Sequence, residues 1–199
     1  MKKTMIKAAL AGSMLFSGVL GQVVVTNAAA AKPAATAAPV APVVRDNLSN
    51  YGLKKDIELP VTVTAGGFSY TLEKIMIMET KSAAAQALIK KYGYSVDKKY
   101  FIWTKMTIAN NSKVVVQQSS KDMSDKWRLI FEDDAYKSMP SLKADLVNNK
   151  EALWSWKLAP SQKLSTYQAY SYDGSFDVFL ITVDNKKNSE FKYVVPQVK

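Results

Sequence analysis

The chain has 199 residues and contains neither cysteine nor histidine. This composition excludes a Ser-His-Asp triad and any zinc or copper site built on imidazole or thiolate ligands, so we expect no metal and no cofactor. The chain carries 27 basic and 17 acidic residues, but its only arginines are Arg45 and Arg128, which argues against nucleic-acid recognition. We expect the positive charge to favour an anionic surface, such as a wall polymer or lipid headgroups.

Residues 1–30 have the order of a secretory signal peptide. Three lysines within the first seven residues precede an apolar run from Ala8 to Leu20, and a small-residue stretch, Asn27 to Ala30, follows. We therefore expect cleavage and a protein that is secreted or associated with the cell wall, with no transmembrane segment left after cleavage. Because a lipoprotein carries its lipid on a cysteine, we expect no lipid anchor. An uncleaved anchor stays open, since the apolar character continues through Val25 to about 20 residues.

Residues 31–46 are rich in alanine and proline and show no periodicity, which is typical of a disordered tether. The remainder, 47–199, has the length of one ordinary domain. It has no disulfide to stabilise it, so it must hold its hydrophobic core unaided, and its length is sufficient for that.

The domain begins with two alternating runs that predict strands. In 57–64 apolar and polar residues alternate, and Pro60, which cannot donate a ladder hydrogen bond, places this strand at an edge. Gly66–Gly67 predicts a turn. The second run, 68–77, changes phase at Lys74, which indicates a bulge.

Residues 82–92 predict the one clear helix. Ser82 is an N-cap residue type, and Gly93 can end the helix in the left-handed conformation. One apolar stripe at helical spacing faces the sheet, formed by Ala85, Leu88, Ile89 and Tyr92.

The remaining elements are short strands. The strongest is 100–109, whose even positions from Tyr100 to Ile108 share one face. A turn at 110–112 is expected to lead into a return strand that starts at Val114–Val116. Residues 141–152 favour one or two helical turns. Five further alternating runs predict strands: 127–131, 154–158, 164–172, 176–183 and 191–195. Regularly spaced strands without crossover helices predict an all-β antiparallel sandwich.

Three segments resemble the DUF4352-type, immunoglobulin-like "immunoprotective extracellular" domains of bacterial exported proteins. They are Lys99–Ser112, with its T-I-x-N-N-S end, Trp156–Gln162, which is similar to an L-x-P-G-Q turn, and the closing strand Phe191–Val195. Ser161 stands where that family usually has glycine. The resemblance implies an immunoglobulin-like antiparallel β-sandwich with an extracellular role, and it implies no catalytic residue.

Clustered aromatic residues are the candidate ligand face. Aromatic side chains on an exposed sheet face could stack on sugar rings or hold a peptide, whereas the same residues could equally fill the sandwich core. The six candidates are Trp103, Trp154, Trp156, Tyr167, Tyr170 and Tyr172.

Acidic residues offer weaker alternatives. Asp133–Asp134 and the pair Asp173 and Asp177 could supply oxygens to calcium, but neither spacing is that of an EF-hand loop. A carboxylate pair for glycoside cleavage could come from Glu73, Glu79, Glu132 or Glu151, but nothing in the sequence brings two together. No G-x-S-x-G motif occurs, so we expect no catalytic residues.

The sequence therefore predicts an exported, non-enzymatic β-sandwich that mediates binding or contact with the cell envelope. The expected partner is an anionic wall polymer or another envelope protein. Two alternatives stay open: a carbohydrate- or wall-active accessory module or weak glycosidase, and a structural surface-layer component.

Overall fold

The computed structural model describes residues 43–118, 127–185 and 188–196. The predicted signal peptide and all of the predicted tether before Val43 lie outside the described residues. Within the described part, no helix is both long enough and apolar enough to cross a membrane.

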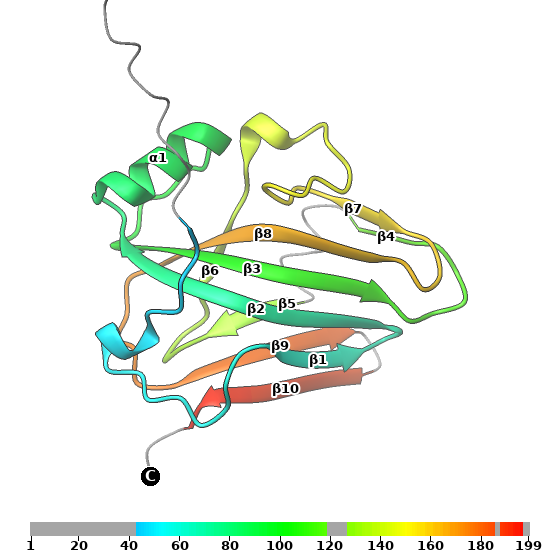
Figure 1. The fold of residues 1–199 in the computed structure, drawn as a ribbon, viewed down its shortest axis with the longest axis horizontal. Helices are drawn as coiled ribbons and strands as arrows, with labels where there is room; N and C mark the ends of the chain where they lie inside the picture. The colour runs from blue at the N-terminus through cyan, green and yellow to red at the C-terminus, as the bar shows by residue number, and fades with distance from the viewer. Residues whose placement is uncertain (1–42, 119–126, 186–187, 197–199) are drawn as a thin grey trace, which may run out of the picture. The chain divides into compact units, whose positions relative to one another are not determined.

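Two antiparallel sheets form the body of the domain (Figure 1). The larger sheet has the strand order β1 (Val61–Ala65), β2 (Phe68–Glu79), β3 (Tyr100–Asn110), β8 (Lys163–Tyr172) and β6 (Tyr136–Ser138). The smaller sheet has the order β10 (Asn188–Val195), β9 (Phe179–Asn185) and β5 (Trp127–Ile130). A separate pair joins β4 (Val116–Gln118) to β7 (Trp156–Leu158). This arrangement confirms the predicted all-β antiparallel sandwich.

The main core lies between the two sheets. Strand alternation sends Tyr70, Leu72 and Ile102 inward from the larger sheet, where they pack with Leu129 and Ile181 from the smaller one. Every one of these side chains is fully or almost fully buried. Burial of such side chains is the principal force that holds a two-layer sandwich together.

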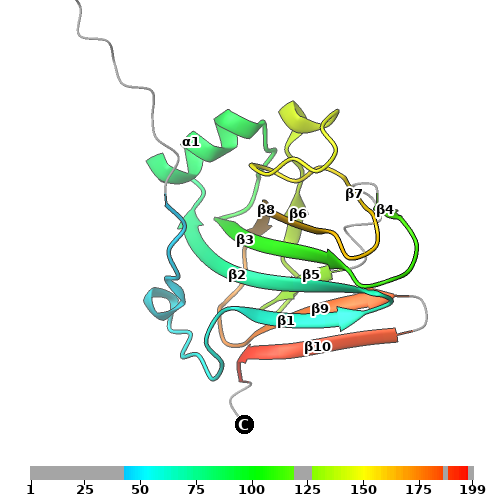
Figure 2. The same cartoon turned by 45° about the vertical axis from the view of Figure 1, so that its right-hand side comes forward.

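A second core lies on the opposite side of the larger sheet, under helix α1 (Ala83–Tyr92). Figures 1 and 2 show α1 on the side of β2 and β3 that faces away from β9 and β10. Ala85, Leu88 and Tyr92 of the helix pack on Phe101 and Trp103 of β3. The larger sheet is therefore buried on both faces at the helix end, and β3 is apolar on both faces there.

The predicted cap and end of the helix, the predicted turn and the predicted bulge are confirmed. The Ser82 side chain accepts a hydrogen bond from the Ala85 backbone N–H at 3.3 Å, and Gly93 ends α1 with φ of 72°. Gly66 and Gly67, both with positive φ, form the two-residue turn between β1 and β2. The phase change in β2 is a bulge between Leu72 and Lys74.

Some predicted boundaries and pairings are wrong. The first strand begins at Val61, because the backbone N–H groups of Asp56 and Ile57 donate to Val194 at the end of β10 instead of to a ladder. The return strand expected after β3 pairs with β7, because β2 and β8 already occupy both edges of β3.

Shorter elements also differ from the sequence prediction. Residues 141–152 contain one 3-10 turn, η2 (Ser141–Lys143), and a further 3-10 turn, η1 (Leu48–Tyr51), precedes β1. Strand β6 was not predicted, since three residues are too few to show a period. The strands expected over 154–158 and 176–183 begin two and three residues later, at Trp156 and Phe179.

Candidate functional site

The six candidate aromatic residues do not form one exposed face. Tyr170 and Tyr172 point inward from β8, and Trp156 from β7 joins them in the main core, while Trp103 is buried under α1. Only Trp154 and Tyr167 are half-exposed. Of the six, Trp103 and Tyr167 line one cleft together, whereas Tyr170 and Tyr172 each line a different hollow.

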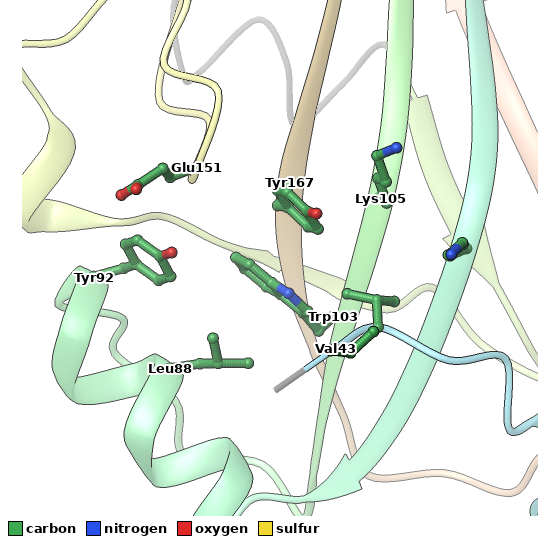
Figure 3. Close-up of a pocket in the computed structure, with 9 residues that line it drawn as sticks. Val43, Leu88, Tyr92, Trp103, Lys105, Glu151 and Tyr167 are labelled. Carbon is green, nitrogen blue, oxygen red and sulfur yellow. The ribbon is translucent and has the colours of Figure 1, made fainter. Parts of the chain in front are cut away.

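The cleft has a volume of about 380 Å³ and opens on the outer face of the larger sheet, beside α1 (Figure 3). Leu88 and Tyr92 of the helix form one wall. Trp103 and Lys105 of β3 and Tyr167 of β8 form the floor. The chain enters the domain here as well, because Val43 and Val44 line the cleft and Val44 is buried in the core under α1.

A row of nearly parallel rings leads from the buried face under α1 to the floor of the cleft. Trp103 stacks on Phe101, with ring centroids 6.1 Å apart, and on Tyr167, with centroids 5.4 Å apart and an angle of 9° between the planes. Tyr92 of α1 stacks on Trp103 as well, at 5.6 Å. Tyr167 is the half-exposed end of this row. Because the buried rings hold it in place, it presents an aromatic surface at little entropic cost.

Charged side chains lie beside the exposed ring. Lys105, opposite Tyr167 in the β3–β8 register, is 2.7 Å from the Glu73 carboxylate, which also accepts a hydrogen bond from the Thr107 hydroxyl. Burial acts to raise the pKa of Glu73, but the hydrogen bonds from Lys105 and Thr107 outweigh it and the pKa lies below its usual value. Lys74 also lines the cleft and is exposed, and its charge helps to lower the pKa of Glu73. The exposed ammonium group of Lys74 can therefore meet a ligand.

A row of hydroxyl groups crosses the outer face next to the cleft. Thr62 pairs with Thr71, Thr71 with Thr107, and Thr107 with Ser165, so four neighbouring strands contribute one hydroxyl each. The Thr62 and Thr71 hydroxyls are 2.8 Å apart. This row gives the face beside Tyr167 both donors and acceptors for a polar ligand.

The acidic residues considered for calcium or catalysis lie mainly elsewhere. Asp133, Asp134 and Asp173 line a second hollow, together with Glu132. The Ser175 hydroxyl contacts both Glu132 and Asp177. Among the described residues, no group of three or more acidic side chains is placed to hold a metal ion. The other predicted carboxylates are separate from this hollow: Glu73 and Glu151 lie near the cleft, and Glu79 lies at the end of β2.

The sequence could have indicated the two cleft lysines. Lys105 is the one charged position inside β3, Lys74 follows Glu73 inside β2, and the predicted bulge at Lys74 gave a further signal. The sequence predicted a helix packed on the sheet, but no pattern showed which end of which face it would cover, so these lysines could not be placed at a cleft.

Comparisons with known proteins do not assign a family. No family model matches the sequence, and no curated protein matches it. Among solved structures, the chain is similar to the lipoprotein candidate ycdA from Bacillus subtilis subsp. subtilis str. 168, with 9% identity and a TM-score of 0.44, over 69% of this chain and 39% of that chain. It is also similar to the yjhA protein from Bacillus subtilis, with 11% identity and a TM-score of 0.39, over 64% of this chain and 84% of that chain.

The chain therefore spans less than half the length of ycdA. These similarities are too slight for any function to be transferred. The resemblance to DUF4352-type domains stays a prediction.

Proposed function

We propose that the chain is an exported, non-enzymatic binding domain that holds a sugar ring of an anionic cell-envelope polymer in the cleft beside α1. The observation that supports this proposal is the half-exposed Tyr167, stacked on Trp103 and flanked by Lys74 and Lys105. A pyranose ring has an apolar face that packs on an aromatic ring, and its hydroxyl and acid groups need polar partners at the rim.

The arrangement of charge favours an anionic ligand. Glu73 already neutralises Lys105, while Lys74 is available for a carboxylate or phosphate of the polymer. The hydroxyl row from Thr62 to Ser165 extends from the cleft across the sheet, so neighbouring units of a chain could be bound in series. An ammonium group on an exposed face acts mainly through long-range attraction, so this binding should weaken as salt rises.

The carboxylates near the cleft support a non-enzymatic role. Glycoside cleavage needs one carboxylic acid whose pKa is raised, so that it can donate a proton near neutral pH. Glu73 has the opposite shift, since Lys105 and Thr107 favour its ionised form. Glu151 is exposed and lies 3.9 Å from Lys143.

The test is cosedimentation of the exported chain with purified cell-wall polymer at low and high salt. We expect Tyr167→Ala to weaken binding about tenfold, about 1.4 kcal/mol, because a central aromatic contact is lost. Lys74→Glu should weaken binding most at low salt. The matched controls are Tyr136→Ala, an exposed tyrosine on β6, and Lys54→Glu, an exposed lysine after η1, both outside the cleft.

Equal retention of the wild-type chain and the Tyr167→Ala and Lys74→Glu variants would contradict the proposal. Release of soluble sugar from the polymer, lost in Glu132→Gln, would instead favour a hydrolase that acts at the second hollow.

A further inference from the structure

The segment 141–150 exposes an unusual amount of apolar surface. Leu142, Leu146 and Val147 are 66%, 46% and 53% exposed. Three of the nine large, exposed apolar side chains of the described residues thus fall within six consecutive positions. Single exposed apolar residues are common, but such a concentration marks a surface that contacts something apolar.

The exposure is built into the fold, because both ends of the segment are anchored. The Ser141 hydroxyl donates to the Gly93 carbonyl at 2.6 Å, which fixes the segment to the end of α1. The Asn148 side chain donates to the Lys157 carbonyl and accepts from the Lys157 N–H, both at 2.8 Å, which fixes it to β7. Between these anchors, the Leu146 N–H donates to the Lys143 carbonyl. The apolar side chains are therefore held outward on a formed loop.

The same surface is basic. Lys143 and Lys150 lie on the loop, and Lys90 and Lys91 lie on the last turn of α1, which contacts η2. The acidic residues here are Asp145 on the loop and Glu151 just after it, so this surface carries four lysines and two carboxylates. Glu151 lies 3.9 Å from Lys143. The surface keeps a net positive charge around its apolar centre.

We propose that Leu142, Leu146 and Val147 dock the domain on an anionic lipid bilayer. The three side chains enter the headgroup region, and the surrounding lysines contact lipid phosphates. Apolar side chains ringed by lysine are the composition of interfacial membrane-binding surfaces. Protein interfaces instead concentrate aromatic residues and arginine and are depleted in lysine, and 141–150 contains no aromatic residue and no arginine. None of the three apolar residues lines the polymer cleft, although Glu151, at the border of this surface, does.

The first test is partition of the exported chain onto vesicles of phosphatidylcholine with phosphatidylglycerol, compared with phosphatidylcholine alone. We expect preference for the anionic vesicles and about a tenfold or larger loss in the triple variant Leu142→Ser, Leu146→Ser, Val147→Ser. Lys143→Glu with Lys150→Glu should remove the preference for anionic lipid. The control is Phe191→Ser, which changes an exposed apolar residue on the smaller sheet. Unchanged partition of the triple variant, or an equal loss in the control, would overturn the proposal.

A second measurement avoids dependence on the triple variant. The chain has no cysteine, so Val147→Cys and Phe191→Cys each give one site for an environment-sensitive dye. Vesicles should shift the emission of the dye at position 147 to the blue and leave the dye at position 191 unchanged. A dye at position 147 that stays in water while the chain is vesicle-bound would contradict docking through this loop. The vesicles contain no sugar polymer, so neither result depends on the cleft.

Discussion

A buried glutamine connects the two sheets at the level of single residues. The Gln168 side-chain oxygen accepts hydrogen bonds from the Trp127 indole N–H and from the Tyr170 hydroxyl, both at 2.9 Å. The Thr104 hydroxyl donates to the Gln168 backbone carbonyl. All of these residues are buried, so water cannot replace a lost partner.

We expect Gln168→Leu to lower the free energy of unfolding by about 2–4 kcal/mol, because it removes the buried acceptor that the Trp127 indole and the Tyr170 hydroxyl share. Urea unfolding of the wild-type and variant chains measures the difference. Gln117→Leu, at an exposed position of β4, is the matched control and should change the free energy by less than about 0.5 kcal/mol. Similar small effects at both positions would show that the buried network adds little to stability.

The ion pair between Glu73 and Lys105 should make a small part of the stability depend on pH. The pKa of Glu73 lies below its ordinary value, against the effect of burial, because Lys105 and Thr107 bond its ionised form. Its contribution is therefore present above the pKa of the unfolded state and is lost as the pH falls through the lowered folded-state pKa. Both side chains are partly exposed, so we expect the ion pair to contribute at most about 1 kcal/mol to the free energy of unfolding.

Unfolding of the wild type and Lys105→Met at a series of pH values tests this linkage. The stability difference should be largest near neutral pH and should shrink once Glu73 is protonated in the folded wild type. A difference that stays constant down to strongly acidic pH would mean that Lys105 contributes by packing alone.

At the scale of elements, α1 depends on its end at Gly93. Gly93 has φ of 72°, and a Cβ there would lie 2.5 Å from the Ser141 hydroxyl oxygen and 2.7 Å from Cγ of Leu142. Gly52 has a similar φ of 80°, but a Cβ there would meet nothing within 4 Å. The two glycines therefore separate backbone strain from a steric clash.

We expect Gly52→Ala to lower the free energy of unfolding by about 1 kcal/mol, because alanine is strained in the left-handed backbone conformation. Gly93→Ala should cost about 1–3 kcal/mol more, because either the helix end or the 141–150 loop must move. Thermal unfolding of both variants gives the comparison. Equal losses of stability in the two variants would mean that α1 and the 141–150 loop can move apart at Gly93 without a steric penalty.

Local signals predicted those elements whose ends are set by neighbouring residues. Ser82 and Gly93 marked α1, and the glycine pair marked the first hairpin. The pairing of β4 with β7 could not be predicted, since it depends on which strand edges are free in the assembled sheet. The three-residue β6 carries no period, and its place is set by the free edge of β8.

At the scale of the whole molecule, two cores share one sheet, and this determines where the candidate site lies. Alternation in the sequence predicted a sandwich, but it could not decide which aromatic residues would be covered. Phe101 and Trp103 point away from the main core and are nonetheless buried, because α1 packs over them. Beyond the helix the same face is uncovered, and Tyr167, Lys74 and the hydroxyl row lie at this boundary.

Binding of an envelope polymer at this boundary is the central claim, and an NMR titration tests it most directly. Purified wall polymer fragments would be added to the isotopically labelled, exported chain. We expect the largest shift changes at the Trp103 indole N–H and at Tyr167, Lys74 and Lys105, with little change at Trp127 and Trp156 in the main core. Shift changes centred on the hollow near Glu132 and Asp173, or none at saturating polymer, would contradict the account.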